Sequence, residues 1–168
     1  MPASSNFPRA LTAEARALLA AFRRAKLTLA AAESCTGGMV AGVLTEIAGS
    51  SAVVERGFVT YSNHAKNELL GVPMALIGAK GAVSREVALA MTRGALKNSR
   101  AQVAVSVTGI AGPGGARPGK PVGLVHFAAQ RRGRKPIHVR HVFKGNRAAV
   151  RAAAVSEALR LLRRAAGV

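Results

Sequence analysis

Apolar positions along the chain repeat with two periods, one typical of helices and one typical of strands. Apolar side chains recur at helical spacing from Leu11 to Phe22, whereas residues 27–32 and 52–61 are short apolar or β-branched runs typical of strands. The same criteria predict helices over residues 39–47 and 65–70, a helix that begins after Ser84, and a helix over residues 147–165 capped by Asn146. They predict strands over residues 102–108, 122–129 and 137–143. The chain therefore reads as α, β, α, β, α, α, β, β, β, α.

This order predicts an α/β fold, a three-layer α/β/α sandwich around a mixed, mostly parallel sheet. The last two strands are joined only by the basic turn at residues 131–136, which is short enough for a hairpin and so makes that pair antiparallel. A length of 168 residues suits a single domain over residues 1–168, with a loose start over residues 1–8.

Charge is the unusual feature of the composition. The chain has 25 Lys and Arg against 7 acidic residues, a net charge of +18, and residues 91–168 hold 16 of the basic residues but only one Glu. This balance attracts anions such as phosphorylated small molecules or nucleic acid, although a biased base composition of the genome would produce it too. All seven acids are Glu, which excludes a Ser-His-Asp triad.

The cysteine content and the hydropathy of the chain limit the cellular environments that the sequence fits. Cys35 is the only cysteine, so no intrachain disulfide can form, and no apolar run approaches the roughly 20 residues that span a bilayer. The Arg-rich, acid-poor start has some features of a transit peptide, but it fits an amphipathic helix better. We expect a cytoplasmic protein without a membrane partner.

A first candidate site lies where the strand over residues 27–32 gives way to a helix. There, residues 32–38 (AESCTGG) place Ser34 at a turn with glycines that let a ligand approach the backbone. Ligands of open α/β sheets bind at the carboxyl ends of strands, and free N–H groups at a helix start could serve as an oxyanion hole. Ser34 is thus a candidate nucleophile, with a simple helix cap as the alternative, and Cys35 is expected to pack as a small apolar residue.

A second candidate follows the next strand. Tyr61 and Lys66 flank another strand-to-helix turn and could face the same cavity as Ser34. A serine needs a base to attack an amide, and burial lowers the pKa of a lysine toward the range in which it can act as one. The alternative is that Lys66 is an ordinary solvated lysine.

A third candidate is the Gly/Pro-rich stretch over residues 109–121, which could be a lid, a substrate-cradling loop or a plain surface loop. It is not a P-loop, because Pro121 stands where Ser or Thr must hold magnesium and a strand follows. The four histidines form no metal signature, since His138 and His141 fall on opposite faces of one strand. We expect neither a metal nor a cofactor.

Together these segments resemble one family, the C-terminal domain of the competence/damage-inducible CinA proteins, which also occurs as a stand-alone nicotinamide-nucleotide amidase. The resemblance extends over about residues 10–165. It rests on four ordered motifs: residues 32–38 (AESCTGG), 57–63 (GFVTYSN) with Lys66, 81–84 (GAVS), and 107–113 (VTGIAGP) followed by 120–123 (KPVG).

The resemblance implies the hydrolysis of nicotinamide mononucleotide to nicotinic acid mononucleotide and ammonia, in pyridine nucleotide salvage, by a protein that is a homo-oligomer. It implies Ser34 as nucleophile, Lys66 as base and Tyr61 as proton relay or orienter. The implied substrate contacts are Thr36, Gly37, Gly38, Asn63, Thr108, Gly109, Gly112 and Arg147, of which Arg147 would bind the phosphate. Asn146 stands where relatives often have Asp. The competing hypothesis is a catalytically silent nucleic-acid-binding module, against which the scarcity of aromatic residues argues.

Overall fold

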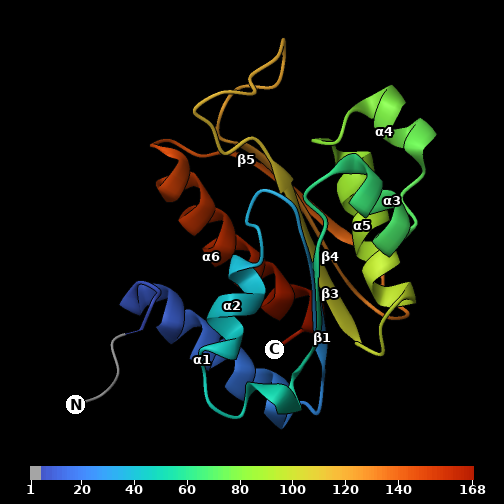
Figure 1. The fold of residues 1–168 in the computed structure, drawn as a ribbon. Coiled ribbons are helices and arrows are strands. Elements are labelled where there is room, and N and C mark those ends of the chain that lie inside the picture. Colours follow the sequence, from blue (N-terminus) through green and yellow to red (C-terminus); the bar gives the residue numbers. More distant parts are fainter. Residues whose placement is uncertain (1–4) are drawn as a thin grey trace.

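The computed structural model describes residues 5–168, whose five strands form one sheet in the order β2-β1-β3-β4-β5 (Figure 1). The strands are β1 (Leu29–Glu33), β2 (Val54–Val59), β3 (Val103–Gly109), β4 (Leu124–Arg131) and β5 (Ile137–Val142). β1 pairs in parallel with β2 and β3, while β4 is antiparallel to both β3 and β5. The mixed sheet and the final hairpin are confirmed, and four of the five strands run in the same direction.

Helices cover both faces of this sheet. They are α1 (Arg9–Arg24), α2 (Met39–Thr45), α3 (Asn63–Leu70), α4 (Met74–Lys80), α5 (Arg85–Lys97) and α6 (Arg147–Ala166), with a short 3₁₀ turn at Ser50–Ala52. Figure 1 shows α1, α2 and α6 on one face and α3, α4 and α5 on the other, which confirms the three-layer sandwich. Within residues 5–168, every helix is too short or too polar to cross a membrane.

Alternation along β1 divides its side chains between the two layers. Leu29 and Ala31 belong to the core beneath α1, α2 and α6, whereas Ala30 and Ala32 belong to the core beneath α3, α4 and α5. Continuing the same period, Glu33 should point toward α2, and Ser34 should point toward α3. The pleat of one strand thus determines which helix each of these two polar side chains can reach.

The ends of several helices follow from local chemistry. Ser62, Ser84 and Asn146 each accept a hydrogen bond from the backbone N–H three residues on, so the expected caps at Ser84 and Asn146 are confirmed. Asn146 therefore supplies the cap without the charge that an Asp would carry.

One helix of the fold was not expected from the sequence. α4 was not expected, because its seven residues after Pro73 are too few to establish a period. Residues 5–8 of the expected loose start contain neither helix nor strand, and the rest of that start lies outside the described residues.

Candidate active site

Ser34 and Lys66 meet at the carboxyl end of β1. Ser34 continues the sheet, because its N–H donates to the Val107 carbonyl at 2.9 Å, and its side chain then falls on the α3 side. Lys66 lies one turn into α3, and its Nζ is 3.1 Å from Ser34 Oγ and 2.9 Å from the Thr60 carbonyl. Since β1 and β2 are parallel neighbours, the turns that follow them adjoin at one edge of the sheet, which brings the two side chains together.

The surroundings of Lys66 favour its neutral form. The side chain is only 1% exposed, and no carboxylate among residues 5–168 lies within ion-pairing distance of its Nζ. Burial lowers the pKa of Lys66 below 10.5, and the nearby Cys35 thiol opposes this only in part. A neutral amine donates to the Thr60 carbonyl and still has a lone pair with which to accept the Ser34 proton.

Glu33 occupies the start of α2, contrary to the expectation of free N–H groups there. Its carboxylate accepts hydrogen bonds from the amides of Gly38, Val40 and Ala41 at 2.9 to 3.1 Å, and the side chain is 1% exposed. The Gly37 N–H donates to the Ser34 carbonyl. Gly37 and Gly38 thus have no free amide for a substrate. Both have positive φ, so they are needed for the turn itself.

Two amides remain beside Ser34. Among the described residues, the N–H groups of Cys35 and Thr36 have no hydrogen-bond acceptor, and the buried Thr36 hydroxyl has no partner either. The carbonyls of the same two residues are held by Arg151 of α6, at 3.1 Å from Nε and 3.0 Å from Nη2. Sequence reasoning missed Arg151, because more than a hundred residues separate it from the loop that it contacts.

Tyr61 and Arg147 form a second group next to the serine turn. Arg147 donates from Nη2 to the Tyr61 hydroxyl and from Nη1 to the Gly112 carbonyl, both at 2.9 Å. Tyr61 is 60% exposed, and its hydroxyl makes no hydrogen bond to Ser34 or Lys66. The structure therefore brings together Tyr61, Arg147 and Gly112, three of the expected site residues. It pairs the tyrosine with Arg147 and not with Lys66.

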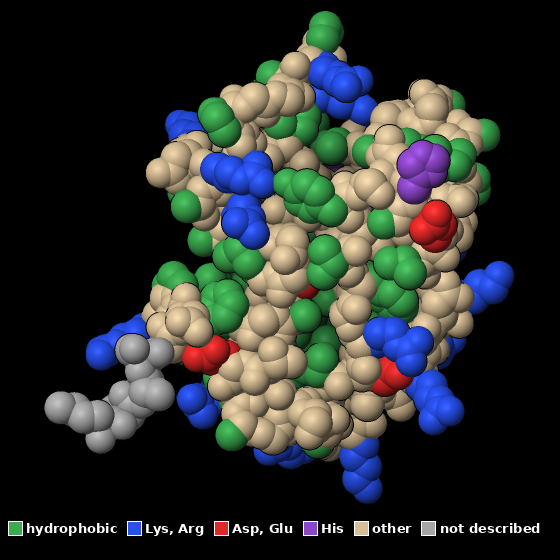
Figure 2. All heavy atoms as spheres, in the orientation of Figure 1, with side chains coloured by type: hydrophobic (Ala, Val, Ile, Leu, Met, Phe, Trp, Pro, Cys, Tyr) green, Lys and Arg blue, Asp and Glu red, His purple; other side chains and the backbone are tan. Residues whose placement is uncertain are grey.

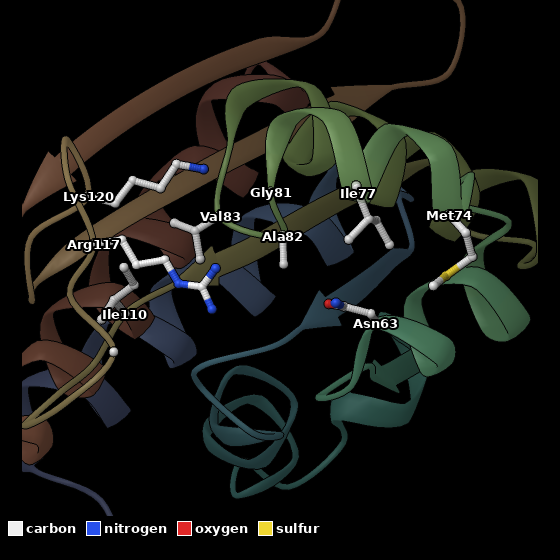
Figure 3. A pocket seen from close by; sticks show the side chains of 11 residues that line it. Asn63, Met74, Ile77, Gly81, Ala82, Val83, Ile110, Arg117 and Lys120 are labelled. Atoms are coloured by element: carbon white, nitrogen blue, oxygen red, sulfur yellow. The ribbon is translucent and has the colours of Figure 1, made fainter.

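A pocket of about 490 Å³ opens between α3, α4 and the loop over residues 110–121 (Figure 3). Asn63 and Arg117 project into it from opposite sides, and Lys120 lies on the same wall as Arg117. The remaining lining residues are glycines and apolar residues. The loop bends tightly where Arg117 and Lys120 exchange backbone hydrogen bonds, and Lys120 Nζ donates to the Lys80 carbonyl at the end of α4. The Gly/Pro-rich stretch is thus one wall of a pocket.

Thr108 and Gly109 support this region from inside. Thr108 is 1% exposed, and its hydroxyl donates to the Ala82 carbonyl at 2.8 Å, next to the pocket. A Cβ on Gly109 would lie 2.8 Å from the Leu124 carbonyl oxygen and 3.1 Å from Cys35 Sγ, so only glycine fits against the serine turn. Neither residue has a side chain that can reach a ligand as the structure stands.

Cys35 packs in the core beneath α2 and α6 and is 6% exposed. Burial is the main reason why its pKa rises to about 11, and the Glu33 carboxylate adds to the effect. A thiol that stays protonated near neutral pH is a poor nucleophile.

Histidines and surface charge give no competing site. His126 Nδ1 and His138 Nε2 lie 3.0 Å apart, but no three potential metal ligands cluster anywhere in the described chain. The face in Figure 2 shows Lys and Arg side chains scattered over it without one continuous patch. Several arginines are engaged within the fold, as when Arg131 and Arg132 donate to backbone carbonyls of the α6 and α5 ends.

Comparison with known proteins places this geometry in a family. The model of the CinA C-terminal domain matches residues 11–166. The Escherichia coli K12 protein named nicotinamide-nucleotide amidohydrolase PncC is 53% identical over 135 residues, which cover 80% of this chain and 82% of that protein. A CinA-like protein of Geobacter sulfurreducens is 52% identical over 144 residues, 85% of this chain but 34% of that protein, so the chain spans about a third of its length.

Solved structures agree with the sequence matches. The competence/damage inducible protein CihA of Agrobacterium tumefaciens superposes with a TM-score of 0.92 at 51% identity, covering 95% of this chain and 97% of the other. A CinA superfamily protein of Escherichia coli superposes with a TM-score of 0.87 at 32% identity, covering 94% and 92%. The chain therefore belongs to the CinA C-terminal domain family.

Proposed function

We propose that this protein is a nicotinamide-nucleotide amidase, which hydrolyses nicotinamide mononucleotide to nicotinic acid mononucleotide and ammonia in pyridine nucleotide salvage. The observation that carries the proposal is the 3.1 Å contact between Ser34 Oγ and a buried lysine amine that has no carboxylate partner among the described residues. The relative named nicotinamide-nucleotide amidohydrolase, which is 53% identical over most of both chains, supports this class of substrate.

The first half of the reaction forms an acyl-enzyme. Neutral Lys66 accepts the Ser34 proton as Oγ attacks the carboxamide carbon, and the amides of Cys35 and Thr36 are the donors available to the developing oxyanion. As the tetrahedral intermediate collapses, the C–N bond breaks, and the Lys66 ammonium returns the proton to the departing nitrogen. Ammonia leaves, and the nicotinoyl group stays esterified to Ser34.

The second half regenerates the enzyme. Water occupies the place that ammonia has left, Lys66 accepts a proton from it, and the resulting hydroxide attacks the ester carbonyl. Collapse breaks the bond to Ser34 Oγ, which takes the proton back from Lys66, and nicotinic acid mononucleotide is released. Every proton transfer involves only Ser34, Lys66, water and the leaving group.

The rest of the mononucleotide requires an apolar surface and an anion site close by. The pocket beside Asn63 supplies some apolar surface, and Arg117 and Lys120 supply positive charge. Arg147 is a further candidate for the phosphate, because guanidinium binds phosphate in two-pronged fashion, although binding would require it to leave Tyr61 or Gly112. Tyr61 would then be freed to orient the substrate, the role that we propose for it. Assembly as a homo-oligomer also remains a proposal.

A coupled ammonia assay with nicotinamide mononucleotide tests the function. Ser34→Ala and Lys66→Met should each lower kcat by at least about 10³-fold, as removal of a nucleophile or its base does in other hydrolases. Lys97→Met, at an exposed lysine of α5, is the matched control and should keep full activity. Absence of ammonia release by the unmodified protein would refute the proposal. In that event, nucleic-acid binding that weakens steeply with salt would support the silent binding module.

A further inference from the structure

We propose that Arg151 is a positioning residue that holds the loop following Ser34, so that the amides of Cys35 and Thr36 face the substrate carbonyl oxygen. This inference rests on the proposed hydrolysis at Ser34. It assigns to a residue of the last helix a part in the chemistry carried out at the end of the first strand.

The contacts of Arg151 converge on one short loop. Nε donates to the Cys35 carbonyl at 3.1 Å, and Nη2 donates to the Thr36 carbonyl at 3.0 Å. The next residue is Gly37, whose missing Cβ would lie 3.4 Å from the same Nη2. A planar guanidinium thus contacts three consecutive residues, and two of its N–H groups hold two consecutive peptide groups, the second of which also accepts from the Met39 amide at 3.1 Å.

The first of these peptide groups carries the free amide of Thr36. The second carries the amide of Gly37, which donates to the Ser34 carbonyl and so fixes the peptide group that bears the free amide of Cys35. The amides of Gly37, Gly38, Val40 and Ala41 are all engaged within the protein, whereas among the described residues those of Cys35 and Thr36 are not. Each peptide plane is rigid, so fixing the carbonyl of Cys35 fixes the amide of Thr36 on the opposite side of that plane. Holding the Cys35 carbonyl on the α6 side therefore directs the Thr36 amide away from α6.

The charge of Arg151 has no carboxylate partner among the described residues, and the side chain is half-buried on α6. A purely structural tie between helix and loop could be made by a neutral side chain. A guanidinium adds positive charge behind the Cys35 carbonyl, which strengthens the polarisation of the Thr36 amide toward an oxyanion. Behind the Thr36 carbonyl it strengthens the Gly37 hydrogen bond that orients the peptide group of the Cys35 amide. This is an effect on the transition state, so it should appear in kcat and leave KM nearly unchanged.

The test compares Arg151→Ala, Arg151→Lys and Arg151→Ala supplemented with guanidinium, beside Arg164→Ala, an exposed arginine of the same helix, as control. We expect kcat for ammonia release to fall about 100-fold in Arg151→Ala with little change in KM, since misplacement of a reacting geometry by about 1 Å costs this much. Arg151→Lys should keep about a tenth of the activity, added guanidinium should restore part of the loss, and Arg164→Ala should match the unmodified protein.

A second readout does not depend on the natural substrate. Labelling of Ser34 by a fluorophosphonate, followed by intact mass, also requires amides that stabilise a negative oxygen, and its rate should fall in parallel in Arg151→Ala. If the unmodified protein releases no ammonia but labelling still depends on Arg151, the substrate assignment fails and this inference stands. Equal labelling rates with and without Arg151, no labelling of Ser34 in either protein, or a loss explained wholly by a rise in KM would overturn it.

Discussion

Glu33→Gln is the substitution whose effect on stability follows most directly from the geometry. The glutamine is nearly isosteric, but it replaces an acceptor-only carboxylate by one oxygen and one NH₂ group. With its oxygen in the place of Oε2, glutamine keeps the bonds from Gly38 and Val40 as neutral ones, which lowers each by about 1 kcal/mol. Its NH₂ group then faces the Ala41 amide, donor against donor, and leaving that buried amide unpaired costs about 1–3 kcal/mol more.

The sum is a loss of about 3–5 kcal/mol in the free energy of unfolding, or about 6–20 °C in Tm for a chain of this length. Urea titration followed by circular dichroism measures the first quantity, and differential scanning calorimetry measures the second. Glu46→Gln, at an exposed glutamate just after α2, should change stability by less than about 0.5 kcal/mol. A change below about 1 kcal/mol for Glu33→Gln would refute the conclusion that this carboxylate holds the start of α2.

Three further predictions concern titration and reactivity. Catalysis needs neutral Lys66, and burial lowers the pKa of Lys66 below 10.5, so kcat/KM should rise with pH and become constant below pH 10.5. A kcat/KM that still rises at pH 10.5 or above would contradict this. Cys35→Ala should retain most activity, and Cys35 in the folded protein should resist iodoacetamide at neutral pH, because burial raises its pKa to about 11; rapid alkylation with loss of activity would contradict it. Burial beside His138 lowers the pKa of His126 from 6.5 to about 4, so the unfolded chain binds the extra proton between these values. Urea titrations at pH 7 and pH 5 should therefore show stability falling by at most about 2 kcal/mol, less in His126→Asn, and an equal fall in both proteins would oppose the assignment.

The sequence predicts the main pairing of the site because that pairing depends on local signals. Ser34 and Lys66 each follow a recognisable strand by a few residues, and neighbouring parallel strands end at the same edge of a sheet. The alternation of side chains along β1 also determines the face of the sheet toward which each residue points. Applied one residue further, it would have directed Glu33 to α2 and revealed that the helix start is occupied.

Other features depend on contacts that no local pattern encodes. The ties from Arg151 to Cys35 and from Arg147 to Tyr61 each join α6 to a turn in the first half of the chain. Helical periodicity shows only that these arginines lie off the apolar stripe, not what they touch. α4 was missed for a different reason, because seven residues with an internal glycine give neither a clear period nor a strong propensity.

The most direct test of the account is to identify the residue that carries the acyl group during turnover. The protein is mixed with nicotinamide mononucleotide, quenched in acid within milliseconds to seconds, digested and examined by mass spectrometry. We predict a nicotinoyl mononucleotide ester on the peptide that contains Ser34, absent from Ser34→Ala. Turnover with no adduct on that peptide and undiminished activity in Ser34→Ala, or an adduct carried by Cys35, would contradict the account.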